Sequence, residues 1–144
     1  MNNYLLQTLI FLRGDLIKTA KQGKTIQYKQ LMRRYKIPRG TPNGLGIGWL
    51  IGYVSEYESE HGRPLLSSIV VSSGRRDKLY PKGFPSPGFL RIDSISGIKK
   101  RKAGDNRVLS PNEKLFISQC QMVAWNYWRR KKLPKRSLMD FLNR

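Results

Sequence analysis

Hydrophobic residues recur with a helical period over residues 3–20. Leu5, Leu9, Leu12 and Leu16 follow one another at spacings of three or four, and polar side chains occupy most of the intervening positions. This stripe predicts an amphipathic helix. Gly23 follows it, as glycine commonly does after a helix C-terminus, so we expect the helix to end there.

Two further helices are predicted before the middle of the chain. Tyr28–Tyr35 has apolar residues on one side and basic residues on the other, follows the β-prone residues 25–27, and is stopped by Pro38. Leu45–Glu60 has an apolar face that includes Trp49, Leu50, Tyr53, Val54 and Tyr57. Glycines at 44, 46, 48 and 52 are unusual in a helix and indicate close approach by another backbone or a ligand.

The next apolar runs predict strands. Leu65–Ser72 is bounded by breakers and contains a β-branched run, which favours a buried strand. Residues 73–90 are rich in Gly and Pro and predict a long basic loop or wing. Leu90–Ile98 alternates in part and predicts a second strand.

The last long helix has the clearest start signal. Ser110 and Glu113 have the spacing of a capping box, with Pro111 at the first helical position. The helix is expected to reach Trp128, and residues 137–142 are expected to add one more turn. Its expected apolar side consists of Leu115, Phe116, Cys120, Val123, Ala124 and Tyr127.

The order of these elements predicts the fold class. Two helices followed by a strand and a basic loop are typical of a winged helix, so we expect an α+β, winged-helix-like fold with flanking helices. A length of 144 residues suits a single domain over residues 1–144. Within it we expect an N-terminal helix (1–22), a winged-helix-like core (23–98), and a basic loop with a C-terminal helix (99–144).

Charge narrows the choice of partner. The chain has 28 Lys and Arg against 9 Asp and Glu, a formal net charge of +19. Residues 1–72 contribute +6 and residues 73–144 contribute +13. Such an excess repels itself unless a polyanion relieves it, and nucleic acid is the common polyanion, with an anionic membrane surface as the rival.

Basic clusters interleaved with aromatic residues are the candidate binding site. Cations of this kind can contact phosphates, and nearby aromatic rings can stack on exposed bases. The candidate nucleic-acid-binding residues are Tyr28, Arg33, Arg34, Arg39, Arg75, Arg76, Lys78, Lys82, Lys99, Lys100, Arg101, Lys102, Arg129, Arg130, Lys131 and Lys132.

Catalytic and metal chemistry find little support. One His and one Cys do not make a zinc site of the usual ligand count, so we expect no metal and no cofactor. Glu56, Glu58 and Glu60 spread over different helix faces, and no catalytic residue is predicted. The single Cys120 excludes an intrachain disulfide and fits a reducing compartment, and no apolar run is long enough to span a bilayer. We therefore expect a cytoplasmic protein.

Residues 23–74 carry a family resemblance. Gly23, Thr25-Ile26 and Tyr28 precede a short helix, and Arg39 and Gly44 precede the next. Together with the strand that follows, this segment resembles the DNA-binding domain of alkylguanine-DNA alkyltransferases and alkyltransferase-like proteins. The resemblance implies that Tyr28 contacts the DNA backbone and that Arg39 enters a groove.

The reactive pair of that family is missing. The family carries a Cys-His pair before two valines, where this chain has Ser67-Ser68 before Val70-Val71. Alkyl transfer requires an activated thiolate, so the resemblance implies binding without repair chemistry. Alkyltransferase-like proteins also lack the Cys and act by binding.

The sequence therefore predicts a non-enzymatic DNA-binding protein that grips the phosphate backbone. Three alternatives stay open: an RNA-binding or ribosome-associated protein, a small metal-dependent nuclease or toxin, and a phage or mobile-element protein that blocks a host defence. A protein partner also stays open.

Overall fold

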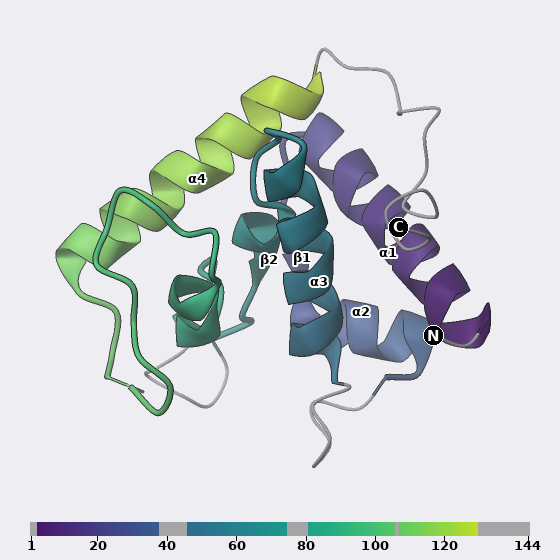
Figure 1. Ribbon diagram of the computed structural model, residues 1–144, viewed down its shortest axis with the longest axis horizontal. Coiled ribbons are helices and arrows are strands. Elements are labelled where there is room, and N and C mark those ends of the chain that lie inside the picture. Colours follow the sequence, from purple (N-terminus) through teal and green to yellow (C-terminus); the bar gives the residue numbers. More distant parts are fainter. Residues whose placement is uncertain (1–2, 38–45, 75–80, 106, 130–144) are drawn as a thin grey trace.

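The protein is a helix-rich α+β structure with one very small sheet (Figure 1). The computed structural model describes residues 3–37, 46–74, 81–105 and 107–129. In these ranges the elements are α1 (Asn3–Lys21), β1 (Ile26–Gln27), α2 (Tyr28–Tyr35), α3 (Ile47–Glu60), the 3-10 helix η1 (Leu66–Ile69), β2 (Val70–Val71), the 3-10 helix η2 (Pro87–Arg91) and α4 (Pro111–Arg129). Figure 1 shows α3 between α1 and the loops that precede α4.

The first two predicted helices are confirmed. α1 buries Leu9, Leu12 and Leu16, and the chain leaves it through Gly23, which has a φ of +67°. Glycine adopts this left-handed conformation without the steric cost that other residues meet. α2 spans the predicted residues and begins where the Gln30 side chain accepts a hydrogen bond from the Gln27 backbone N–H.

α3 is confirmed as a helix, and its described part begins at Ile47. Leu50, Val54 and Tyr57 are buried as expected, whereas Trp49 is 38% exposed. At Gly48 and Gly52 the close approach of another backbone, one of the two explanations for these glycines, is absent among the described residues. A Cβ atom added to Gly48 or Gly52 would meet no other atom within 4 Å.

The strand predicted over Leu65–Ser72 is mostly a turn. Leu66–Ile69 forms η1, and Val70–Val71 forms the strand β2. The Ser68 hydroxyl donates to the Leu65 carbonyl at 2.8 Å, and local bonds of this kind compete with a strand ladder. β2 then pairs in parallel with β1, with Ile26 opposite Val70 and Gln27 opposite Val71.

The second predicted strand, Leu90–Ile98, is wrong. Leu90 belongs to η2, and residues 92–98 form turns and bends. Phe89 and Leu90 are buried together in this turn, 3% and 0% exposed, and the Leu90 carbonyl accepts from the Arg101 N–H at 2.9 Å. The alternation in the sequence therefore reflects a loop with a few inward side chains.

α4 begins as predicted, and four of the six residues expected on its apolar side pack against the interior: Ala124 is buried, and Phe116, Cys120 and Tyr127 are half-buried. The Glu113 N–H donates to the Ser110 hydroxyl at 3.1 Å, and the Ser110 N–H donates to the Glu113 carboxylate at 2.9 Å, which completes the capping box. The buried side consists of Ile117, Gln121, Ala124 and Trp128. Leu115 and Val123, expected on the apolar buried side, are 60% and 55% exposed. Apolar residues of α4 occur on all sides of the helix, so their periodicity did not specify fully which side packs against the core.

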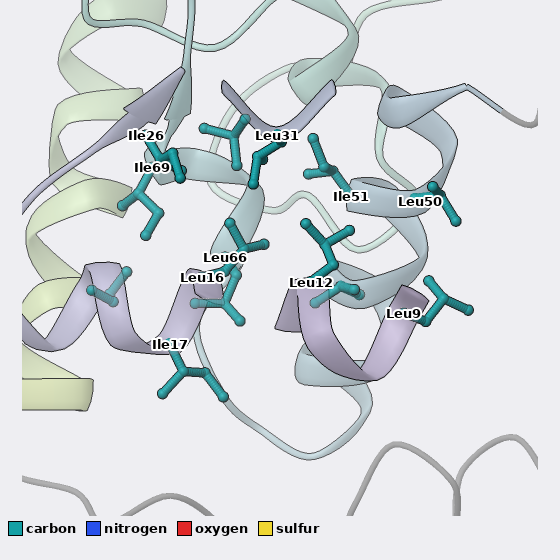
Figure 2. Close-up of a cluster of buried hydrophobic side chains, with 14 of the residues drawn as sticks. Leu9, Leu12, Leu16, Ile17, Ile26, Leu31, Leu50, Ile51, Leu66 and Ile69 are labelled. Carbon is teal, nitrogen blue, oxygen red and sulfur yellow. The ribbon is translucent and has the colours of Figure 1, made fainter. Parts of the chain in front are cut away.

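Two hydrophobic clusters form the interior. In the larger one, leucines and isoleucines of α1 face those of α3 and η1 (Figure 2). The smaller one contains Phe89, Leu90, Leu109 and Ile117. Ala124 and Trp128 of α4 lie in the larger cluster while Ile117 lies in the smaller one, so α4 joins the two.

A charged cluster is enclosed beside the larger core. The Glu58 carboxylate has no exposed surface and accepts hydrogen bonds from the guanidinium groups of Arg13 and Arg63. Both guanidinium groups also lie over the Tyr57 ring, 5.0 and 5.2 Å from its centre. Burial lowers the pKa of Arg63, but the hydrogen bond and charge of Glu58 outweigh it and raise that pKa overall. These contacts bind α1 to α3 and to the segment after it.

No helix within the described ranges is both long enough and apolar enough to cross a membrane.

Candidate nucleic-acid interface

The C-terminal ends of α1 and α4 meet at one corner of the molecule (Figure 1). The Trp125 indole N–H donates to the Lys24 carbonyl at 2.9 Å, and a guanidinium nitrogen of Arg129 lies 3.1 Å from where a Cβ atom of Gly23 would be. We call Lys21, Lys24 and Arg129 the α1–α4 corner. Neither Lys24 nor Arg129 forms an ion pair within the part of the chain that the structure describes.

Only Arg129 of this corner was predicted from the sequence. Lys21 and Lys24 are isolated cations in the sequence, without the run of neighbours that marked the other clusters. Packing of α1 against α4 brings them to Arg129. Cations at helix C-termini also oppose the negative end of the helix dipole, so the corner has a local stabilising role beside any binding role.

The other predicted cations come from separate elements. Arg33 and Arg34 end α2, Lys82 follows the loop after β2, and Lys99, Lys100 and Lys102 belong to the loop before α4; all are exposed. Figure 1 shows α2 and the loops before α4 on opposite sides of α3. The structure therefore spreads these residues over the molecule.

Some of these cations are already neutralised. Arg34 pairs with Asp15 at 3.0 Å, and the Asp15 contact raises the pKa of Arg34. Lys100 pairs with Asp93 at 2.5 Å, and its hydrogen bond lowers the pKa of Asp93. Within the described ranges the exposed predicted cations that form no ion pair are Arg33, Lys82, Lys99, Lys102 and Arg129.

Arg101 requires a correction. It is only 5% exposed, so its burial rules out the phosphate contact expected for it beside Lys100 and Lys102. Its guanidinium donates two hydrogen bonds to the Glu113 carboxylate, both 2.7 Å, and further ones to the carbonyls of Asp105, Arg107 and Val108. The planar five-donor group suits such a site, where it ties the loop to the start of α4. This hydrogen bonding also lowers the pKa of Glu113.

Seven of the predicted residues lie outside the described ranges, so the structure does not place them. They are Arg39, Arg75, Arg76, Lys78, Arg130, Lys131 and Lys132.

Tyr28 has a structural contact at the start of α2. Its ring packs half-buried against the larger core, and its hydroxyl accepts a hydrogen bond from the Ser86 N–H at 3.0 Å. This links α2 to the residue just before η2.

The carboxylates near the site face inward or toward neighbouring cations. Asp15, Glu58, Asp93, Asp105 and Glu113 each pair with Arg or Lys. Hydrogen bonding to Arg107 lowers the pKa of Asp105 to about 2. Glu56 instead accepts from the Ser94 N–H and hydroxyl at 3.4 and 3.2 Å. Because these carboxylates pair within the protein, the remaining exposed cations dominate the charge of the surface.

The groups considered for catalysis are dispersed or enclosed. Ser67 is buried and its hydroxyl bonds to that of Ser55 at 2.7 Å, while burial raises the pKa of the Cys120 thiol to about 11. Glu58 lies inside, whereas Glu60 is exposed. No group of three or more His, Cys, Asp or Glu side chains in the described ranges gathers closely enough to hold a metal ion.

A shallow cleft between α3 and the segment after η2 was not anticipated. Trp49, Tyr53 and Glu56 line it on the α3 side, and Arg91 and Asp93 line it on the other. The rings of Trp49 and Tyr53 lie 5.3 Å apart between centroids. Sequence periodicity had placed Trp49 in the core. Gly52, which lines the cleft and has open space at its Cβ position, was the available signal for an open surface.

Comparison with protein-family models, with curated proteins and with solved structures finds no match to this chain.

Proposed function

We propose that this chain is a non-enzymatic DNA-binding protein that holds the phosphate backbone through its surface cations. One observation carries the proposal. Carboxylates in the described ranges pair with Arg34, Lys100, Arg101, Arg107 and the buried arginines, while Arg33, Lys82, Lys99, Lys102 and Arg129 form no ion pair there. The net charge of +19 is thus directed outward, where a polyanion relieves its self-repulsion.

A winged-helix-like arrangement belongs to this proposal. Its support is the order of α2, α3 and β2, together with hydrogen bonds that join the end of β2 to residues 83 and 84. The Ser72 N–H donates to the Phe84 carbonyl at 2.9 Å, and the Gly83 N–H donates to the Ser72 carbonyl at 3.3 Å. Lys82, which is exposed next to these hydrogen bonds, would lie at the base of the predicted wing.

The alkyltransferase-like resemblance is part of the same proposal. Ser67 and Ser68 are buried and hydrogen-bonded to Ser55 and Leu65, which suits a structural role at the place of the family's reactive pair. Tyr28 would contact the DNA backbone only through the part of its side chain that remains accessible, because the core covers part of the ring and Ser86 bonds to the hydroxyl.

Titrations at several salt concentrations test the proposal directly. Duplex DNA, single-stranded DNA and a structured RNA of equal length would be compared by fluorescence anisotropy. We expect a preference for the duplex and a steep fall in affinity as salt rises, because each phosphate contact releases a counterion. Weak duplex binding at low salt would overturn the proposal, and a clear preference for RNA would favour the second candidate below.

A matched pair of triple variants separates contact from net charge. Arg33, Lys99 and Arg129 changed to Ala remove three cations without ion pairs, whereas Arg34, Lys100 and Arg107 changed to Ala remove three cations paired with carboxylates. Three lost phosphate contacts at about 0.9 each should reduce the slope of log affinity against log salt by roughly 2.7 in the first variant. We expect less than half that reduction in the second. Equal effects would show that net charge alone governs binding.

RNA binding is the second candidate, favoured by the cleft on α3. Trp49 is 38% exposed beside Tyr53, with Arg91 on the opposite wall. An exposed indole beside a second aromatic ring suits stacking on an unpaired base, which is the usual mode of sequence-specific RNA recognition. Trp49→Ala should weaken binding to single strands by about tenfold and leave duplex affinity nearly unchanged if this candidate holds.

A further inference from the structure

The outward face of α4 is uncharged although the chain is strongly basic. Leu115, Met122 and Val123 are 60%, 57% and 55% exposed on this helix. Asn112, Gln119 and Asn126 are also exposed. No Lys, Arg, Asp or Glu lies among the exposed residues between Lys114 and Arg129 on α4.

These residues have the spacing of a helix-packing seam. Asn112, Leu115, Gln119, Met122 and Asn126 are separated alternately by three and four positions. This alternation keeps one line of side chains facing a partner helix. In a coiled-coil heptad, Leu115 and Met122 would occupy one of the two core positions. The amide residues would occupy the other, where polar side chains fix the register between two helices. We call these five residues the α4 seam.

From this we infer that the α4 seam docks an acidic amphipathic helix of another protein. The seam supplies apolar contacts and amide hydrogen bonds without any charge to desolvate. Lys114 and Arg129 lie on α4 near the two ends of the seam, and the chain as a whole has a net charge of +19. The field of that charge attracts a helix with carboxylates on its flanks and accelerates its association.

Charge and side-chain chemistry distinguish this occupant from two others. A second copy of the chain also has a charge of +19, so the same field opposes self-association through this face. A lipid surface favours a broad apolar face, whereas the three amides interrupt this one and would lose their hydrogen bonds in an acyl environment.

A designed peptide provides the probe. It is a helix of about 21 residues with Leu on one seam and Glu on the flanking positions, and a scrambled peptide of the same composition is its control. The protein carries ¹³C-methyl methionine, so that Met122 on the seam reports contact and Met32, which packs against the larger core, serves as an internal reference. We expect the Met122 signal to shift with the designed peptide and Met32 to stay in place. Affinity for the scrambled peptide should be at least tenfold weaker.

Variants locate the contact. Leu115→Ser with Met122→Ser should weaken peptide binding at least tenfold, whereas Phe11→Ser, at an apolar residue of α1 that is 64% exposed, should leave it unchanged. Duplex DNA affinity should not change in either variant, which separates this test from that of the proposed function. The inference would be overturned if the designed and scrambled peptides bind equally well, or if the seam variant binds the designed peptide as tightly as the unchanged protein does. It would also be overturned if no binding is detected at 100 µM peptide.

Three other results would also overturn it by identifying a different occupant. Dimerisation that the seam variant abolishes would show that a second copy covers the seam. Seam-dependent binding to vesicles of anionic and zwitterionic lipid, without peptide binding, would assign a membrane surface. A fall of more than about 5 °C in the melting temperature of the seam variant would show that the chain's own residues cover this face.

Discussion

Glu58 shows how one enclosed carboxylate can organise several elements. It is fully buried between Arg13 of α1 and Arg63, which follows α3, and both arginines are also largely buried. Bringing three charges out of water is costly, and the mutual attraction offsets that cost only when every partner is present. The cluster therefore makes the packing of α1 on α3 dependent on a single side chain.

Replacing this carboxylate should be strongly destabilising. In Glu58→Gln the two guanidinium groups lose their counter-charge inside the protein, and we expect the free energy of unfolding to fall by about 3–5 kcal/mol. Glu60→Gln, on the same helix but exposed, should change it by less than about 0.5 kcal/mol. Urea denaturation measures both. A loss below about 1 kcal/mol at Glu58 would mean that the arginines find other partners.

Cys120 should be an unreactive thiol at neutral pH. Burial raises its pKa to about 11, and only the thiolate is nucleophilic. The folded state therefore favours the protonated thiol. The resulting stabilisation is complete below the unfolded pKa of about 8.5 and is lost as pH rises toward 11.

Alkylation kinetics test this shift. At pH 8 the folded protein should react with iodoacetamide about 10²-fold more slowly than the denatured chain, with a rate that keeps rising to about pH 11. An alkylation rate that reaches a plateau near pH 9 in the folded protein would contradict the burial of this thiol.

Arg101 and Lys102 show how far single residues of the site could be predicted. Both belong to one basic run, and local sequence does not distinguish them. Arg101 is enclosed because Glu113 and three carbonyls converge on it, while Lys102 is exposed. Charge density predicted that cations gather here, but only the path of the loop decides which of them turns inward.

At the scale of elements, helices with strong boundary signals could be predicted well, whereas only two residues of each predicted strand region before the middle loop are paired as strand. The α2 limits and the α4 capping box depend on neighbours a few residues apart. β1 and β2 are two residues each and exist because Ile26 meets Val70, a pairing that no local pattern specifies. The apolar run over η1 fits a buried turn as well as it fits a buried strand. The hydrogen bond from the Ser68 side chain favours the turn.

The glycines of α3 lead to an element-scale prediction. Gly48 lies in the helix with open space at its Cβ position, so Gly48→Ala should raise the free energy of unfolding by about 0.5–1 kcal/mol through reduced freedom of the unfolded chain. Gly62 also has open space but a φ of +69°. Gly62→Ala should therefore destabilise by about 1–2 kcal/mol. Thermal or chemical denaturation of the two variants separates backbone strain from crowding. A loss of stability in Gly48→Ala would contradict the open space at its Cβ position.

The whole molecule combines a large net positive charge with an ordinary hydrophobic core. Exposed charges interact over a Debye length of about 10 Å at 0.1 M salt, so moderate salt screens their repulsion. We expect the melting temperature to rise by several degrees between 20 and 300 mM NaCl, and to rise further with a short polyanion that binds only the folded state. Differential scanning fluorimetry measures this. A melting temperature that is flat or falls with salt would show that the internal ion pairs outweigh surface repulsion.

Global charge was predictable from composition, but its distribution was not. Glu58 pairs with Arg13 although the two residues are 45 positions apart in the chain. The α1–α4 corner likewise assembles from residues about a hundred positions apart. Such convergence depends on tertiary packing, which explains why Lys21 and Lys24 escaped prediction while Arg129 did not.

The contact between α1 and α4 has a consequence for the order of synthesis. Lys24 and Trp125, which hydrogen-bond to each other, are 101 residues apart in the chain. At a translation rate of about 5–20 residues per second, α1 waits roughly 5–20 s before its partner helix is made. During that interval α1 can pack against α3 and η1, but its surface that contacts α4 stays uncovered. A nascent chain halted before α4 should therefore recruit chaperones, and release of the last helix should complete the fold.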